Sequence, residues 1–293
     1  MACIAFSYSL FAQTGTPPSN AEISTGYYDR LNYIFGGMEL NRVPDRLLRD
    51  FAFEFTDLNA YDGTYLVDSN LIDVSAYWDI YRTMMSSRVH TNAAAFTHPE
   101  VLDSLLFSQR QSGQITLAGL FYNYAQFKED AYTSGKVIVS NDIIYDRYIN
   151  GIWQNPYDVK NVLAFAPATY NYEGLNQAFL LPANLWKTNS GNISSIELNA
   201  GNGQGYQTLV PDQNLLISFA DTGIKTLTFR INFSNSTSLY SHSKIHISPS
   251  VIPDNYLMRF GTTNPETIPF TAIDAFEGFF AQGSIMRSFK ISK

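Results

Sequence analysis

The sequence contains very little cysteine and little charge. One of its 293 residues is cysteine, Cys3, so an internal disulfide and a cysteine-based zinc site are both excluded. Charged residues make up 15% of the chain, against about a quarter in ordinary soluble proteins. Ser, Thr and Asn fill most of the other polar positions. A surface that is polar but poorly charged is common among extracellular β-proteins.

Basic clusters and long apolar runs are also missing. The formal net charge is −7 and no run of Lys and Arg occurs. Nucleic acid is therefore excluded as a partner, because phosphate binding needs a clustered basic surface. No apolar run reaches the roughly 18 residues that a transmembrane segment needs. The short apolar run at residues 4–12 resembles the second half of a secretory signal peptide, although no basic residue precedes it. We expect residues 1–13 to be a signal-peptide remnant and the protein to be secreted or held at the cell surface.

Apolar and aromatic residues are abundant. Hydrophobic residues make up 45% of the chain, including 19 Tyr and 21 Phe, so a substantial core is feasible. Over residues 14–112 we expect a mainly helical region. In residues 72–89 the apolar side chains recur at helical spacing after Asp73, which is suited to cap the helix. Residues 96–113 contain a capping box that begins at Thr97.

From residue 114 onward the apolar period changes to two. Residues 114–127 alternate in this way, and short strand candidates follow at intervals of roughly 10 to 15 residues, separated by turn residues. This spacing is typical of β-sandwiches, and no βαβ alternation indicates a nucleotide-binding fold. We predict a mostly β protein, α+β overall, in which antiparallel sandwich units follow the helical region. The expected divisions are a β-rich domain at 113–186, a second sandwich at 187–249, and an extension or further domain at 250–293.

Three glycines alternate after a strand-like run, at Gly201, Gly203 and Gly205. A dinucleotide-binding loop would open a helix, but a strand pattern with a proline follows here, and no Walker lysine is present. A calcium loop gathers several carboxylates, whereas the oxygen-bearing residues here include the neutral Asn199 and Asn202. We predict a turn in which the glycines supply positive φ, with no metal and no cofactor. Metal binding by Asn199 and Asn202 is the weaker alternative.

Residues 198–203 (LNAGNG) and 219–231 (FADTGIKTLTFRI) resemble the PKD-type Ig-like domain. That family has an aromatic-Asp-x-Gly-Asp-Gly turn followed by a strongly alternating strand. The positions that agree are Gly201, Gly203, Phe219, Gly223, Leu227, Phe229 and Ile231, and those that depart are Leu198, Asn199, Asn202 and Lys225. The departures remove both Asp, so any metal or charge role of these Asp does not carry over. The resemblance covers roughly residues 188–248 and implies an Ig-like sandwich there.

A broader resemblance concerns the order of the earlier segments. Residues 43–63, 78–89 and 178–186, ahead of the PKD-like unit, are similar to the N-terminal region of large secreted proteins exported by the type IX route. In those proteins a catalytic part, often an α/β-hydrolase-like domain, and a C-terminal sorting domain follow. The resemblance implies that further domains of the same polypeptide follow Lys293. One alternative function is therefore that of an accessory region to such a hydrolase domain.

The residues that usually carry catalysis have structural explanations in this sequence. No G-x-S-x-G elbow occurs. His242 and His246 are four apart on a strand, about 13 Å, too far for one metal, and we expect them with Lys244 on a solvated face. His90 and His98 lie where helix ends are expected. The best enzyme hypothesis is a carbohydrate hydrolase that uses two carboxylates from Asp57, Asp62, Asp68 and Asp73. Turn and cap roles also explain this set.

Aromatic side chains are the remaining binding candidates. Alternation in residues 114–127 would place Phe121 inward and Tyr122 and Tyr124 outward, and Tyr170 and Tyr172 form a second group. We expect these four tyrosines to contact a carbohydrate or a cell-surface protein. The alternative is that the sheet merely packs on the helical region. The sequence thus favours a non-catalytic extracellular module with a structural, adhesion or spacing role.

Overall fold

The structure is a computed structural model that describes residues 28–89, 93–94 and 96–249. Residues 28–248 belong to one compact unit, and residues 249–293 are assigned to a second one. The expected signal remnant, His90 and the strands or domain expected at 250–293 lie outside the described residues.

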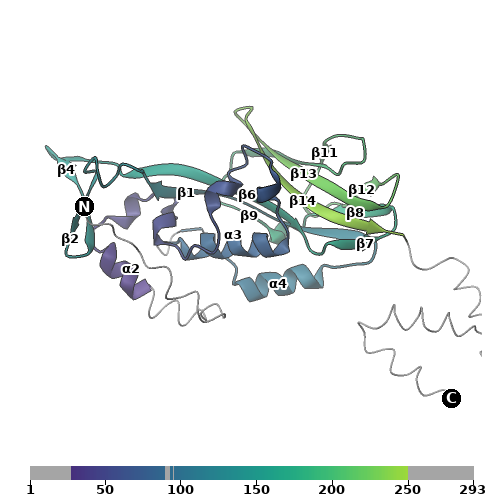
Figure 1. Cartoon of the computed structure of the whole chain (residues 1–293), viewed down its shortest axis with the longest axis horizontal. Coiled ribbons are helices and arrows are strands. Elements are labelled where there is room, and N and C mark those ends of the chain that lie inside the picture. The colour runs from purple at the N-terminus through teal and green to yellow at the C-terminus, as the bar shows by residue number, and fades with distance from the viewer. Residues whose placement is uncertain (1–27, 90–92, 95, 250–293) are drawn as a thin grey trace, which may run out of the picture. The chain divides into compact units, whose positions relative to one another are not determined.

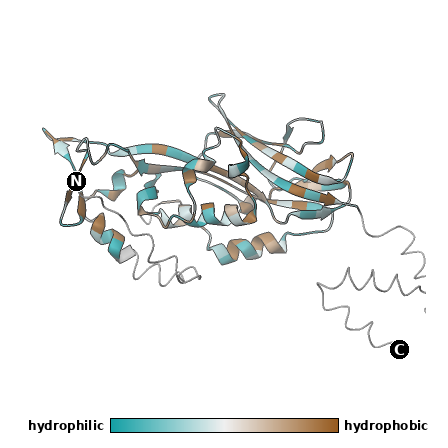
Figure 2. Cartoon of the chain, in the orientation of Figure 1, coloured by the Kyte–Doolittle hydropathy of each residue, from teal (hydrophilic) through white to brown (hydrophobic). Residues whose placement is uncertain are grey.

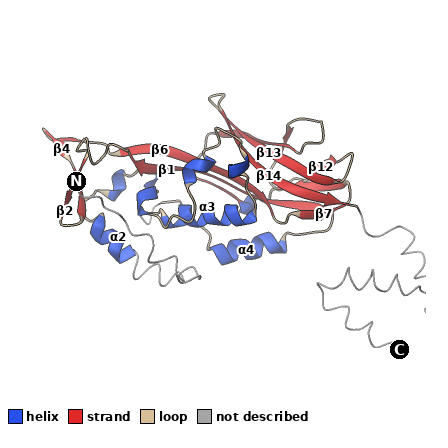
Figure 3. Ribbon diagram, viewed as in Figure 1, coloured by secondary structure: helices blue, strands red, loops and turns tan. Residues whose placement is uncertain are grey.

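Strands make up most of the regular structure of this unit (Figure 3). The α-helices that the structure describes are α2 (Tyr28–Ile34), α3 (Val74–Ser86) and α4 (Pro99–Ser108). Short 3-10 helices are η3 (Leu40–Arg42), η4 (Pro44–Arg46), η5 (Arg49–Phe51), η6 (Leu58–Tyr61), η7 (Asp68–Asn70) and η8 (Ala183–Leu185). The strands are β1 (Gln114–Phe127), β2 (Val137–Ser140), β3 (Ile143–Asp146), β4 (Tyr148–Ile149), β5 (Ile152–Trp153), β6 (Tyr157–Pro167), β7 (Asn171–Glu173), β8 (Asn176–Leu180), β9 (Trp186–Thr188), β10 (Ile193–Asn199), β11 (Gln207–Thr208), β12 (Leu215–Ser218), β13 (Gly223–Phe233) and β14 (Ser238–Ser248). The fold is mostly β, as the sequence predicts.

The strands form two five-stranded sheets and two small hairpins. The first sheet has the order β12-β8-β1-β6, and β9 pairs with β1 further along the edge that β8 occupies. The second sheet has the order β11-β10-β13-β14-β7. β1 and β6 are antiparallel over eleven pairs of residues, among them the pair of Asn123 and Asn161. The hairpins are β2–β3 and β4–β5.

The central strand β1 is buried on both faces. Its side chains at Ile115, Leu117 and Phe121 pack in one cluster with buried residues of both sheets. Side chains at alternate positions, such as Leu120 and Tyr122, pack instead in a cluster with α3 and α4. Successive strand residues point to opposite faces, so this part of the strand contributes to two cores. Figure 1 shows the helices along one side of β1 and β6 and the second sheet on the other side.

The strand β13 of the second sheet is buried on one face. Leu227, Phe229 and Ile231 of β13 point into the cluster that the two sheets share, and the residues between them are partly exposed. Figure 2 shows the resulting alternation of hydrophobic and hydrophilic residues along β13 and β14. This is the period of two expected for a sheet with one face toward the core.

The helices begin close to the positions that their sequence signals predict. Asp73 caps α3, because its carboxylate accepts the N–H of Ala76 at 2.8 Å. The N-cap of α4 is His98 rather than the expected Thr97. The carbonyl of Thr97 accepts a hydrogen bond from the Tyr81 hydroxyl at 2.7 Å, and its hydroxyl accepts one from Lys187 at 3.2 Å. These tertiary contacts use Thr97, and the next residue starts the helix.

The edge of β1 that faces away from β6 is covered by several segments from distant parts of the chain. β8 and β9 pair with its first half. At Asn123 the side chain of Asn189 replaces a strand, because its amide accepts the backbone N–H at 2.9 Å and donates to the carbonyl at 2.8 Å. Leu48 then forms a bridge to Ala125, and the Asp50 carboxylate accepts the N–H of Phe127 at 2.8 Å. The edge thereby keeps its backbone groups paired over most of its length.

Residues 62–72, which we call the strap, cover the edge of β14 that faces away from β13. The carbonyl of Gly63 accepts the N–H of Tyr240 at 2.9 Å, and the N–H of Ile72 donates to the carbonyl of His242 at 2.9 Å. The strap also reaches the first sheet, because the amide of Asn161 donates to the carbonyl of Asp62 at 2.5 Å. The strap therefore connects the edges of β6 and β14.

The first unit runs across the boundaries expected near residues 113 and 187. β12, from the expected 187–249 domain, pairs with β8 of the first sheet, and β7 pairs with β14 of the second. The two sheets also share one buried cluster. Chain segments on either side of both boundaries thus form one structure rather than separate domains.

Candidate functional site

The exposure expected for Tyr122 and Tyr124 is wrong. Their side chains are 1% and 0% exposed, because they lie on the face of β1 that the helical region covers. The ring of Tyr122 stacks on Phe96 with ring centroids 4.8 Å apart. Burial raises the pKa of both tyrosine hydroxyls. Both residues belong to the core and neither presents a surface to a ligand.

Tyr170 and Tyr172 lie on and just before β7 and differ in exposure. Tyr170 is 48% exposed, and its ring stacks on that of His246 at 6.2 Å. Tyr172 packs against the cluster between the sheets, and its hydroxyl accepts the N–H of Thr169 at 3.2 Å. Burial raises the pKa of Tyr172. Among the four candidate tyrosines, Tyr170 alone offers an exposed ring.

His242 lies beneath the strap and not on a solvated face, which corrects the expectation. It is 7% exposed, and its Nε2 lies 3.0 Å from the carbonyl of Val67 and 2.8 Å from Oδ1 of Asn70. The Asn70 amide nitrogen donates to two backbone carbonyls, so its Oδ1 is an acceptor and Nε2 of His242 carries the proton. Burial lowers the pKa of His242 and favours the neutral ring. Lys244 and His246 remain partly exposed.

The four carboxylates of the hydrolase hypothesis lie at separate turns and helix starts. Three of them accept a backbone N–H two or three residues further along: Asp57 from Asn59 at 3.1 Å, Asp62 from Thr64 at 2.8 Å, and Asp73 from Ala76 at 2.8 Å. The fourth, Asp68, is 98% exposed in its side chain and lies 3.6 Å from the Lys244 ammonium. These are the turn, cap and surface roles that such residues fill in most proteins.

The glycine-rich stretch is a turn between β10 and β11, as predicted. Gly201, Gly203 and Gly205 have φ of 70°, 84° and 71°, and no helix starts after them. The Asn199 side chain accepts the N–H of Gly201 at 3.0 Å, and that of Asn202 accepts an N–H at 3.2 Å. Both side chains serve the turn, since each oxygen accepts a backbone N–H.

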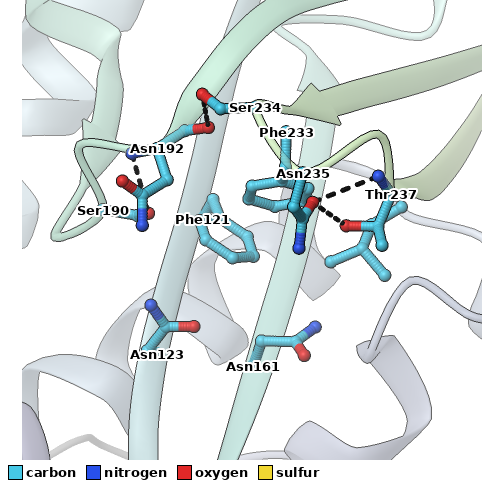
Figure 4. Close-up of a pocket in the computed structure, with 10 residues that line it drawn as sticks. Phe121, Asn123, Asn161, Ser190, Asn192, Phe233, Ser234, Asn235 and Thr237 are labelled. Carbon is cyan, nitrogen blue, oxygen red and sulfur yellow. Dashed lines mark hydrogen bonds between the residues drawn. The ribbon is translucent and has the colours of Figure 1, made fainter.

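A pocket opens where the second sheet ends over β1 and β6. Its volume is about 410 Å³, within the range of small-molecule sites. Ten residues line it: Phe121, Asn123, Asn161, Ser190, Asn192, Phe233, Ser234, Asn235, Thr237 and Leu239. We call it the amide pocket. Figure 4 shows Asn123 and Asn161 on neighbouring strands, with the loop of Ser190 and Asn192 on one side and the β13–β14 turn on the other.

The two loops that flank the amide pocket are connected to each other. The backbone N–H and the hydroxyl of Ser234 both donate to the carbonyl of Asn192, at 3.1 and 3.2 Å. Within the β13–β14 turn, Oδ1 of Asn235 accepts the N–H and the hydroxyl of Thr237, at 3.1 and 2.7 Å. Below them the rings of Phe121 and Phe233 meet edge to face at 5.3 Å. The pocket therefore has an ordered wall and an apolar base.

Several amide groups of the pocket keep unused hydrogen-bonding capacity. Among the described residues, the side chains of Asn123 and Asn192 have no hydrogen-bond partner, although the backbone of each is bonded. Asn161 uses its nitrogen on the strap and keeps its oxygen, whereas Asn235 uses its oxygen and keeps its nitrogen. These donors and acceptors are available to a ligand.

The lining of the amide pocket contains no titratable side chain. In the part of the chain that the structure describes, no group of three or more His, Cys, Asp and Glu is placed to hold a metal ion. The pocket can bind and orient a ligand by hydrogen bonds and apolar contact. It supplies no side-chain acid or base of its own.

The amide pocket has no signature in the local sequence pattern. Its residues come from β1, β6, the loop before β10 and the β13–β14 turn, which are far apart in the chain. The available signal was the density of Asn and Ser in residues 189–195 and 232–238. Such segments ordinarily indicate turns. The pairing of β10 with β13, which puts Ile193 opposite Phe233, brings the two segments together, and the pairing of β1 with β6 puts Asn123 beside Asn161.

Neither the known protein families nor the curated proteins give a match to this sequence. Within the described residues, no helix is long and apolar enough to cross a membrane.

Proposed function

We propose that this chain is a non-catalytic recognition module of an exported protein, and that it holds its ligand in the amide pocket. The observation that carries the proposal is the lining, which combines neutral hydrogen-bonding side chains with an apolar base and lacks a titratable group. Such a site binds a ligand without offering a side chain that would transfer protons near neutral pH.

The extracellular setting and the Ig-like architecture belong to the same proposal. The low charge of the chain suits an extracellular surface, and two sheets that bury side chains against each other are what an Ig-like sandwich requires. Gly201, Gly203, Gly205 and Gly223, which all have positive φ, lie in the segment that resembles the PKD-type domain. We propose a secreted or surface-held adhesion or spacing module, exported by the type IX route and followed by further domains.

The proposal is tested by attachment to a surface. Beads that carry the full chain are applied to an immobilised extracellular matrix of mixed glycoproteins and polysaccharides. The Asn192→Trp variant should abolish attachment, because its indole fills the mouth of the pocket. The variant should still fold, because the exposed Asn192 side chain has no structural partner among the described residues. Asn41→Trp places the same side chain at an exposed position on η3 and should leave attachment unchanged. Equal attachment by all three proteins would refute the proposal.

A second measurement separates recognition from catalysis. The full chain is incubated with soluble polysaccharides and the release of reducing ends is followed. We expect no release above that of heat-denatured protein. Release that Asp62→Asn abolishes and Asp68→Asn retains would instead establish the carbohydrate hydrolase.

A further inference from the structure

We infer that the amide pocket binds a neutral saccharide unit. This inference rests on the proposed function and names the ligand class of the same site. Its basis is the juxtaposition of four Asn side chains from two strands and two loops around partly exposed apolar side chains.

The charge of the lining restricts the ligand. All ten lining residues are uncharged, so an anionic ligand would lose its hydration without gaining an ion pair. Recognition of carboxylate, sulfate or phosphate groups normally uses Arg or Lys, and none lines this pocket. A neutral ligand meets no such penalty.

The hydrogen-bonding groups suit hydroxyls. Each unbonded amide, at Asn123 and Asn192, offers one carbonyl acceptor and an NH₂ donor side by side. A saccharide hydroxyl both donates and accepts, so two neighbouring hydroxyls can bind both atoms of one amide. The free oxygen of Asn161 and the free nitrogen of Asn235 add one acceptor and one donor to the opposite wall.

The pocket is ordered before any ligand binds. Asn123 lies on a strand whose backbone is held by the Asn189 amide, and Asn161 is oriented by its bond to the strap. Asn235 is oriented by Thr237. Because the side chains of Asn161 and Asn235 and the backbone of Asn123 are already held, a small ligand retains more of its interaction energy.

Apolar contact completes the match. Phe233 and Leu239 are partly exposed at the pocket, while Phe121 is buried and closes the base. The C–H face of a sugar ring is apolar and can lie against such side chains. A single unit with few contacts should bind weakly, with a Kd on the order of 1 mM, so firm attachment would need several copies.

The inference is tested with an array of immobilised neutral and acidic glycans, probed with the biotinylated full chain preassembled on streptavidin. We expect binding to neutral glycans, loss of binding in Asn192→Trp and retention in Asn41→Trp. The best neutral saccharide is then titrated into ¹⁵N-labelled protein. Side-chain NH₂ signals of Asn123 and Asn192 should shift, and Asn123→Ala should raise the Kd about three- to tenfold, as expected for one lost hydrogen bond. Asn41→Ala should leave the Kd unchanged.

Two results would overturn the inference. The first is selective binding of sulfated or carboxylated glycans. The second is an array without any bound glycan, and the matrix assay then separates the two proposals. If matrix attachment still depends on Asn192, the recognition function survives and the saccharide inference fails. If attachment is also independent of Asn192, both fail.

Discussion

The buried ring of His242 makes the stability of the unit sensitive to acid. Its pKa is lowered by burial in the folded state, so the unfolded chain binds this proton more readily. Above about pH 6.5 both states hold the ring neutral, and the free energy of unfolding should fall as the pH drops through that value. Urea unfolding between pH 8 and pH 5 measures this decrease.

The contribution of His242 is isolated by substitution. His242→Gln keeps a donor toward Val67 and Asn70 without titrating, so its free energy of unfolding should depend less on pH than that of the wild type. Parallel pH curves for His242→Gln and the wild type would contradict the assignment.

Single residues also show where the sequence signals were sufficient. Asp73 is predicted as an N-cap because a carboxylate directly before an apolar stripe can accept a backbone N–H of the first helical turn. This interaction is local in sequence, and the structure confirms it. Thr97 had an equally good local signal, but Tyr81 and Lys187 engage it from elsewhere in the fold. The alternation of its strand places His242 correctly on the face opposite the core. That this face is covered could not be predicted, because the strap that covers it is distant in sequence.

At the scale of the element, the edge of β1 at Asn123 depends on one side-chain amide. Asn189→Ala removes both hydrogen bonds to the backbone of Asn123 and should lower the free energy of unfolding by about 1–3 kcal/mol. Asn214→Ala, at an exposed position directly before β12, should change it by less than about 0.5 kcal/mol. Guanidinium unfolding of both variants provides the comparison. Equal stability would mean that water replaces the Asn189 amide without loss.

The contact between the strap and β14 is equally specific. A Cβ on Gly63 would lie 2.9 Å from Cβ of Leu239, and φ is +81°, so Gly63→Ala is both strained and crowded. Gly174→Ala has a similar φ of +83° but open space, and it measures the backbone strain alone, about 1 kcal/mol. Gly63→Ala should cost about 1–3 kcal/mol more, because the strap must move off β14. Similar melting curves for the two variants would show that the strap is loosely held.

The positions of the strands were predicted better than the strands with which they pair. The period of two identified β1 to its terminal residues, because alternation is a local property of the chain. Which sheet a strand joins is not local: β12 lies between β11 and β13 in the sequence and pairs with β8. The predicted exposure of Tyr122 and Tyr124 was wrong for the same reason. Alternation separates the two faces of a strand, but it does not show that helices cover the second face.

At the scale of the unit, each buried cluster contains or contacts one of the three tryptophans. Trp78 packs against the cluster under the helices, Trp186 against that between the sheets, and Trp153 against that near the hairpins. Because β1 contributes to all three clusters, we expect them to unfold together. Fluorotryptophan labelling gives three ¹⁹F signals without a substitution, and all three should disappear at one urea concentration. If the Trp153 signal disappears at a lower urea concentration than the others, the cluster near the hairpins unfolds independently.

The contact between the strap and β14 can form only after most of the unit has been synthesised. Residues 63 and 72 meet their backbone partners at residues 240 and 242, so more than 160 residues of intervening chain must be synthesised before the contact exists. Closing so long a loop is slow compared with local turns. A nascent chain in which β14 has not yet been synthesised leaves the strap without these backbone partners, so this contact can form only late in synthesis.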